Sequence, residues 1–263
     1  MCRTGSRDIA KSVAVAAVML AIAMSTGSVQ GQQPAPVTTT SPMDEPLRLV
    51  AAAAKTYERV QDYTCLFIKK ERINGQLQAD NLISMKVRTR PFSVYMQWLG
   101  PQDVKGQEVC YVAGKNDGMM RIHPAGRLRG ALGFLSIDPN DPRVKENSRH
   151  AITEAGIGHL IDAYSKRWSQ EKAWNQTRVS VADYEYAKRQ CRRVEMVHPA
   201  NGQQYYPYYR SVVYFDKQTT LPIRVENYDY PRNGGSPGGD LAESYSYVQM
   251  RFNASLRDSD FDR

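Results

Sequence analysis

The sequence predicts an α+β protein built on a single, strongly curved antiparallel β-sheet, with two or three helices on the inner side of the sheet. About nine segments rich in β-branched and aromatic residues follow one another with turn signals between them, which is typical of antiparallel strands. Two further segments repeat apolar residues at helical spacing. Because nothing marks an internal domain boundary, one sheet accounts for the folded length, and a sheet of nine strands must curl.

The first 31 residues are predicted to be a secretory signal peptide. Arg3, Arg7 and Lys11 precede the apolar run 13–24, and small and polar residues follow it. This run has 12 residues, whereas a membrane span needs about 20. We therefore expect a chain exported to the periplasm or cell envelope, with no transmembrane segment after cleavage.

Residues 32–46 hold four prolines and no apolar periodicity, which predicts an extended, flexible leader. The folded domain is expected to span 47–263. Its first helix is predicted over about 46–61, because two acidic residues and Pro46 favour a helix start. Apolar residues then recur at helical spacing, namely Leu47, Val50, Ala54 and Tyr57.

From Tyr63 onwards, the apolar period changes from helical spacing to two. The predicted strands are 63–72, 81–89, 92–99, 108–113, 177–186, 189–198, 208–215, 221–228 and 241–252. Tight turns such as Asn74-Gly75 separate them, and successive strands joined in this way pair antiparallel. Apolar residues alternate along them, so one face of the sheet should be apolar and the other polar.

The segment 124–142 interrupts the series of strands. It combines several glycines and prolines with apolar side chains that a long loop must bury against something, so we predict that it forms a lid or plug. The lid residues are Leu128, Leu132, Phe134 and Leu135. A second helix is expected to follow, with Thr153 as its N-cap. Its apolar face should hold Ile157, Leu160, Ile161, Tyr164 and Trp168.

Charge and motifs exclude several classes of function. Without residues 1–31 the chain carries 32 Lys and Arg against 26 Asp and Glu, a net charge of +6 dispersed as singles and pairs. We therefore expect no nucleic-acid binding, although the charge is compatible with peripheral contact with a membrane. No nucleophile elbow, phosphate loop or zinc-protease motif occurs, and the histidines are scattered over four segments. We expect no enzyme activity, catalytic residue, metal site or cofactor.

Three cysteines remain after the predicted cleavage, namely Cys65, Cys110 and Cys191. An oxidising compartment allows one disulfide among them and one free thiol, and the sequence does not choose among the three pairings. All three lie in apolar, strand-like runs, so they could equally be buried small hydrophobic residues. Either structural role is favoured over a reactive nucleophile.

The C-terminal third contains an Asp-x-x-Thr-x-Leu-Pro turn at 216–222 and a tail from Asn253 to Phe261. These features resemble the closing hairpin of the LolA/LolB-like lipoprotein-carrier superfamily. Earlier segments, 64–71, 85–88, 91–95 and 106–111, resemble a bacterial secreted domain family of unknown function that we associate with that superfamily. Together the resemblance covers about residues 47–262.

The resemblance implies an unclosed half-barrel whose concave face is covered by helices and whose apolar cavity accepts acyl chains. The expected cavity residues on the sheet are Phe67, Met85, Val87, Val94, Met96 and Trp98. Our leading hypothesis is thus a non-enzymatic envelope protein that binds a lipid or a lipidated partner. Two alternatives stay open: an envelope scaffold whose core is filled by its own side chains, and a hydrolase of unrecognised type.

Overall fold

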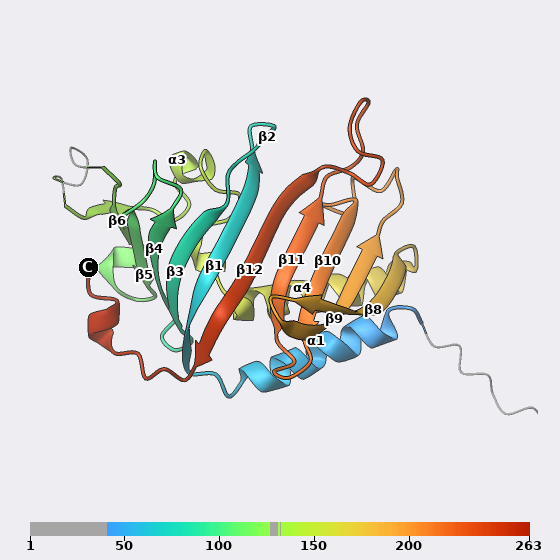
Figure 1. The fold of residues 1–263 in the computed structure, drawn as a ribbon, viewed down its shortest axis with the longest axis horizontal. Coiled ribbons are helices and arrows are strands. Elements are labelled where there is room, and N and C mark those ends of the chain that lie inside the picture. The colour runs from blue at the N-terminus through green and yellow to red at the C-terminus, as the bar shows by residue number, and fades with distance from the viewer. Residues whose placement is uncertain (1–40, 127–130, 132) are drawn as a thin grey trace, which may run out of the picture. The chain divides into compact units, whose positions relative to one another are not determined.

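The computed structural model describes residues 41–126, 131 and 133–263 (Figure 1). Contacts divide the chain into residues 1–39 and 40–263, and every described helix and strand belongs to the second unit. The predicted signal peptide, most of the predicted leader, and the lid residues Leu128 and Leu132 lie outside the described residues.

An open antiparallel sheet of 12 strands forms the framework of this unit. The strands are β1 (Asp62–Ile73), β2 (Gln76–Leu77), β3 (Asn81–Arg88), β4 (Ser93–Gly100), β5 (Glu108–Val112), β6 (Met120–His123), β7 (Leu135–Ile137), β8 (Arg178–Tyr186), β9 (Arg189–Val197), β10 (Arg210–Asp216), β11 (Pro222–Tyr228) and β12 (Leu241–Phe252). The predicted α+β class with a curved, unclosed sheet is confirmed. The count of nine was too low, because β2, β6 and β7 have only two to four residues and too few alternations to detect.

The two halves of the sheet meet at its centre. Its order is β7-β6-β5-β4-β3-β1-β12-β11-β10-β9-β8, with β2 on the end of β1, so β1 and β12 join strands from opposite ends of the sequence (Figure 1). Register shifts interrupt the pairing between Thr64 and Leu66 and between Tyr214 and Phe215. Such bulges bend a strand and increase its twist, which explains how this sheet curves without closing.

Helices α1 (Asp44–Tyr57), α3 (Pro142–Lys145) and α4 (Ile157–Trp174) accompany the sheet. Helix α1 begins two residues earlier than predicted and includes the last three residues of the expected leader. The predicted N-cap Thr153 is wrong, because this residue lies in a separate 3-10 turn, Ile152–Glu154. Gly156 caps α4 instead, with a φ of 100° that favours glycine.

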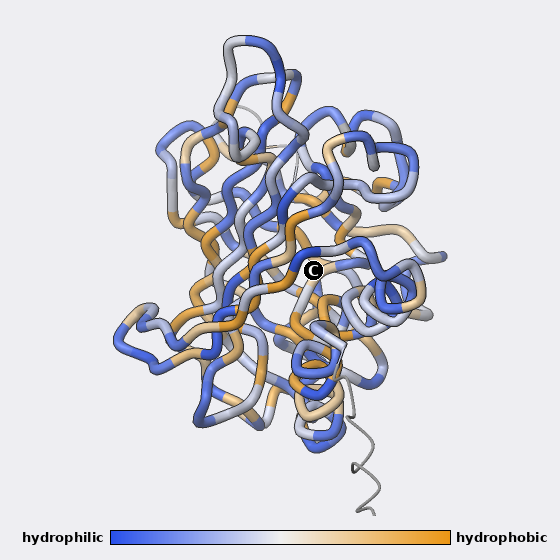
Figure 2. Tube along the Cα trace, turned by 90° about the vertical axis from the view of Figure 1, so that its right-hand side faces the viewer, coloured by the Kyte–Doolittle hydropathy of each residue, from blue (hydrophilic) through white to orange (hydrophobic). Residues whose placement is uncertain are grey.

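The main core lies between the concave face of the sheet and helices α1 and α4. Ile157, Ile161 and Trp168 of α4 are buried there, as the predicted apolar face requires. The two helices cross closely at Gly158, where an added Cβ would lie 2.5 Å from the Tyr57 ring. Figure 2 shows hydrophobic residues concentrated along the strands and hydrophilic residues in most connecting loops.

The opposite face of the sheet carries two smaller apolar clusters. In one, Phe261 and Leu256 of the C-terminal tail pack against Tyr95 and Cys110. The three cysteines are buried and free, so of the two structural roles left open by the sequence the structure has buried thiols and no disulfide among the three. The reason is geometric: Cys65 belongs to the concave core, and Cys110 and Cys191 belong to separate clusters on the other face.

Candidate ligand-binding cavity

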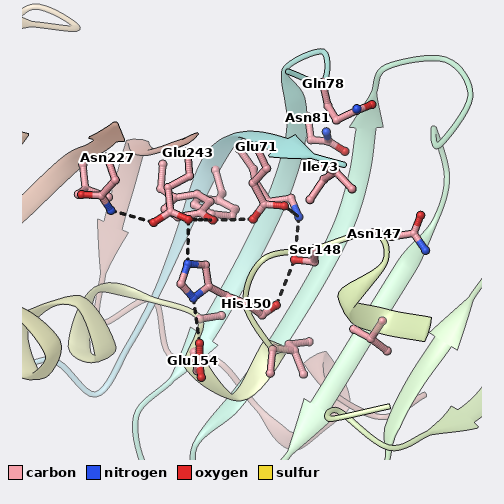
Figure 3. A pocket seen from close by; sticks show the side chains of 18 of the residues that line it. Glu71, Ile73, Gln78, Asn81, Asn147, Ser148, His150, Glu154, Asn227 and Glu243 are labelled. Carbon is pink, nitrogen blue, oxygen red and sulfur yellow. Dashed lines mark hydrogen bonds and ion pairs between the residues drawn. The ribbon is translucent and has the colours of Figure 1, made fainter. Parts of the chain in front are cut away.

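A cavity of about 1360 Å³ lies within the curve of the sheet. Strands β1, β4–β6 and β9–β12 supply one wall, and the chain from α3 through α4 supplies the other. Apolar and polar stretches of the lining are separate. Strands β4 to β6 contribute mostly apolar side chains, whereas β1, β11 and β12 also place charged and amide groups in the cavity (Figure 3).

The six sheet residues expected in the cavity fall into two groups. Phe67, Met96 and Trp98 line it. The other three do not line it and are at most 1% exposed, namely Met85, Val87 and Val94. Alternation along the strands identified the concave face but did not show where the helices cover it.

The two described lid residues, Phe134 and Leu135, do not line the cavity. Phe134 packs against the His123 ring, with 5.3 Å between centroids, and Leu135 in the edge strand β7 is 38% exposed. Other apolar side chains line this part of the cavity, including Ile137 of the same predicted segment and Val144 and Ile152 further along the chain.

Glu243 of β12 is the centre of a buried polar cluster in the cavity. Its side chain is 2% exposed and accepts hydrogen bonds on both oxygens. Tyr208 Oη and Asn227 Nδ2 donate to Oε1 at 2.8 Å each, and Arg149 Nε donates to Oε2 at 3.0 Å. His150 Nε2 also lies 3.0 Å from Oε2 (Figure 3). This carboxylate therefore ties β12 to the segment before α4.

The pKa values of the Glu243–His150 pair move in opposite directions. Burial alone would raise the pKa of Glu243, but the hydrogen bond and charge of His150, with those from Asn227 and Tyr208, lower it to about 2. Burial would lower the pKa of His150, but bonds to and charges of Glu243 and Glu154 outweigh it and raise it to about 9. At neutral pH this is an ion pair.

A second carboxylate, Glu71 of β1, stands beside Glu243 and is 3% exposed. Tyr245 Oη donates to Glu71 Oε1 at 2.5 Å and lies 3.3 Å from Glu243 Oε2, so it links the two acids. Lys69 Nζ donates to Glu71 Oε2 at 2.9 Å and to Ser148 Oγ at 3.0 Å. The charges of this cluster are thus paired within the cavity wall.

Sequence reasoning missed this cluster, although a signal for it existed. Glu71 has the same parity along β1 as Phe67, and Glu243 has the same parity along β12 as Tyr245 and Tyr247. Acidic residues at inward-facing positions of predicted strands indicate a buried polar site, because a buried carboxylate needs partners. The partner His150 lies on a loop, where no periodicity could place it.

A smaller polar group lies at the end of the cavity beneath α4. His198 Nε2 is 3.3 Å from Glu171 Oε2, and both side chains are at most 3% exposed. The His198 ring stacks on Tyr206 with 4.3 Å between centroids. Within the described residues, no group of three or more His, Cys, Asp or Glu side chains could hold a metal ion. None of the helices placed by the structure is long and apolar enough to cross a membrane.

An open, curved sheet around a large cavity with apolar and polar walls defines a half-barrel protein with an internal cavity. The chain belongs to the family described as "Protein of unknown function (DUF1571)", whose model matches residues 60–263. The predicted membership in a domain family of unknown function is thereby confirmed. No curated protein matches the chain in a sequence comparison.

Solved structures of similar fold include a lipoprotein and a LolA superfamily protein. The Mycobacterium tuberculosis lipoprotein LppX is 9% identical, with a TM-score of 0.47 over 83% of this chain and 100% of that chain. LprF from Mycobacterium bovis is 10% identical, with a TM-score of 0.44 over 85% and 99%. A LolA superfamily protein from Nitrosomonas europaea is 9% identical, with a TM-score of 0.35 over 82% and 96%.

Proposed function

We propose that this chain is a non-enzymatic envelope protein that binds a lipid or a lipidated partner in its cavity. The cavity volume of about 1360 Å³ carries the proposal. Pockets for small ligands measure about 300–1,000 Å³, so there is room for acyl chains. Each methylene transferred from water to an apolar wall gains about 0.8 kcal/mol.

The apolar wall supplies the surface that acyl chains need. Trp98, Ile122 and Leu160 line the cavity and are only partly buried by protein, so a ligand would cover their remaining surface. The wall is built from both the sheet and α4, which would enclose a chain on opposite sides. This arrangement supports a bound ligand over a scaffold whose core is filled by its own side chains.

The described cysteines and acids support binding rather than catalysis. Burial raises the pKa values of the Cys65 and Cys191 thiols, and it raises that of Cys110 to about 11. These thiols therefore stay protonated and are poor nucleophiles. In the cavity, the Glu243 carboxylate is engaged on both oxygens, and His150 is held between two acids.

Export is part of the proposal. It rests on the charged start and short apolar run of residues 1–31, which precede the proline-rich leader and the half-barrel domain that begins with α1. An exported protein with a net charge of +6 after cleavage could make peripheral contact with an anionic membrane while it exchanges its ligand.

The test is to express the full chain in an exporting bacterial host, extract the purified protein for lipids, and titrate it with a fluorescent fatty acid. Ala163 of α4 lines the cavity and is exposed to it, so Ala163→Trp should fill the space without disturbing the core. Ala52→Trp on the exposed side of α1 is the matched control, because Ala52 does not line the cavity.

We expect co-purified lipid in the wild-type protein and saturable binding of the fatty acid. Ala163→Trp should weaken binding at least about tenfold, which corresponds to losing about two methylene contacts, and Ala52→Trp should leave it unchanged. A protein that carries no lipid and binds no fatty acid would instead support the filled scaffold. If both variants bound the fatty acid equally, the ligand would bind outside this cavity.

A further inference from the structure

We propose that the mouth of the cavity selects a neutral, hydroxyl-rich head group, so that the ligand is a glycosyl lipid. This inference rests on the proposed function and adds the chemical class of the ligand to it. It is carried by six exposed or half-buried carboxamide side chains that line the cavity, which we call the carboxamide mouth. They are Asn74, Gln76, Gln78, Asn81, Gln107 and Asn147.

The carboxamide mouth is assembled from separate parts of the chain. Asn74 lies in the turn after β1, Gln76 in β2 and Asn81 at the start of β3. Gln107 precedes β5, and Asn147 follows α3. Figure 3 shows Gln78, Asn81 and Asn147 around the pocket. All six side chains are exposed or half-buried, so the cavity reaches the protein surface here.

Several of these amides keep hydrogen-bonding capacity for a ligand. Gln78 Nε2 donates to the Gln76 carbonyl, and Asn147 Nδ2 donates to the Arg143 carbonyl, which leaves their amide oxygens as acceptors. In the part of the chain that the structure describes, the side chains of Gln76 and Gln107 have no hydrogen-bond partner. A carboxamide both donates and accepts, which matches sugar hydroxyl groups that do the same.

Trp98 adds an apolar platform beside the amides. Its indole Nε1 donates to Asn81 Oδ1 at 2.7 Å, which fixes the ring in the cavity wall. Because the indole N–H is the only polar group of the side chain and is already bonded, the ring presents apolar surface to the cavity. A flat apolar surface next to several amides suits the mixed character of a sugar, which has C–H faces and hydroxyl edges.

The charges at this end disfavour an anionic head group. Lys69 is bonded to Glu71, and Arg143 is bonded to Asp141 through both Nε and Nη2 at 3.0 and 2.6 Å. Each cation is thus already neutralised by a carboxylate, which weakens its attraction for a phosphate. Asp103 and Glu146 also line the cavity, and their negative charge would repel it.

The experiment compares lipids with identical acyl chains in displacing a fluorescent fatty acid from the full chain. The probes are monoglucosyl diacylglycerol, diacylglycerol and phosphatidylglycerol, with a triacylated lipopeptide as a lipidated partner. The variant Gln76→Ala/Gln107→Ala removes two amides and keeps the backbone bonds of both positions. Gln170→Ala/Gln218→Ala is the matched control, since both glutamines are exposed outside the cavity.

We expect the glucosyl lipid to bind about tenfold more tightly than diacylglycerol and phosphatidylglycerol, the effect of one to two hydrogen bonds. The Gln76→Ala/Gln107→Ala variant should reduce that preference to about twofold or less. Its affinity for diacylglycerol should not change, which also shows that it is folded. The control variant should keep the full preference.

Equal binding of all head groups would overturn this inference and leave the proposed function standing. Tighter binding of phosphatidylglycerol or of the lipopeptide would also overturn it, because either would assign the mouth to another head group. A preference that survives the Gln76→Ala/Gln107→Ala substitutions would show that the sugar lies elsewhere. If no lipid displaces the probe and the probe itself does not bind, the proposed function fails instead.

Discussion

The concave face of the sheet contains two regions that look alike in sequence and differ in structure. Under α1 and α4, residues such as Tyr63 and Val87 are fully buried. Towards β4–β6, Trp98 and Ile122 continue the same alternation but line the cavity. The strands are equally apolar in both regions. Whether an apolar strand face becomes core or cavity wall therefore depends more on the elements that cover it than on the alternation of apolar residues along the strand.

The two regions are also held together differently. The helix-covered region is fixed by close packing, as at Gly158, where only a glycine allows α4 to approach Tyr57. In the cavity region, Arg149 and His150 fix the segment before α4 to the sheet through Glu243. Packing is insensitive to charge, whereas this connection depends on it. Substitutions in each region can therefore distinguish packing from charge.

Glu243→Gln should destabilise the cavity region. This substitution keeps the shape of the side chain but leaves Arg149 and His150 without their buried counter-charge. Removing one partner of a buried pair costs about 3–5 kcal/mol. Because Arg149 and His150 are 29% and 40% exposed, solvent screens their charges, and we expect a loss at the lower end, about 3 kcal/mol, in the free energy of unfolding. Glu154→Gln is the control. It touches the same imidazole at 2.9 Å, but Glu154 is 44% exposed, so the cost should stay below about 1 kcal/mol.

Urea denaturation of both variants at pH 7 measures this difference. If Glu243→Gln were as stable as Glu154→Gln, the Glu243 ion pairs would not hold the cavity wall. The comparison between a packed region and a charge-held region would then be wrong.

Two isoleucine-to-alanine substitutions should show how tightly each region is packed. Ile161 of α4 is 3% exposed and packs in the main core outside the cavity lining. Ile161→Ala should therefore lower the free energy of unfolding by about 3 kcal/mol. Ile122 lines the cavity and is only half-buried, so Ile122→Ala should cost about 1 kcal/mol or less. Denaturation midpoints measure both. Equal losses would mean that the cavity lining is packed like the core.

Much of this fold could be predicted from the sequence, because alternation and turns are local properties. All nine predicted strands are present, and the predicted apolar face of α4 is buried. The division of Phe67 and Met96 from Met85 and Val94 could not be predicted. All four alternate in the same way and belong to the same apolar cluster, and which of them reach the cavity depends on how the rest of the chain is arranged around it.

The polar part of the cavity was harder to predict for a related reason. Glu71 and Glu243 come from strands at opposite ends of the sequence, and they meet only because β1 pairs with β12. Glu71 is in fact directly opposite Glu243 in that pairing. The carboxamide mouth likewise depends on turns and loops, whose positions no periodicity fixes.

Alkaline pH should lower the stability of the cavity region, by less than the substitutions above. The pKa of His150 is about 9 in the folded chain and about 6.5 in an unfolded one, so its contribution is complete below about pH 6.5 and is lost as pH rises through 9. The imidazole is 40% exposed, so solvent screening should keep the loss below about 1 kcal/mol. Thermal melting at pH 6 and 9.5 measures it.

Two histidine variants isolate this effect from the general charge of the protein. In His150→Gln, the alkaline loss should disappear relative to the wild type. His159→Gln is the control, because burial lowers the pKa of His159 and its effect on stability therefore falls on the acid side. If the wild type and the His150→Gln variant lost the same stability between pH 6 and 9.5, the bond to Glu243 would not depend on protonation of the His150 imidazole. The cavity wall would then be fixed by the neutral hydrogen bonds of Tyr208 and Asn227.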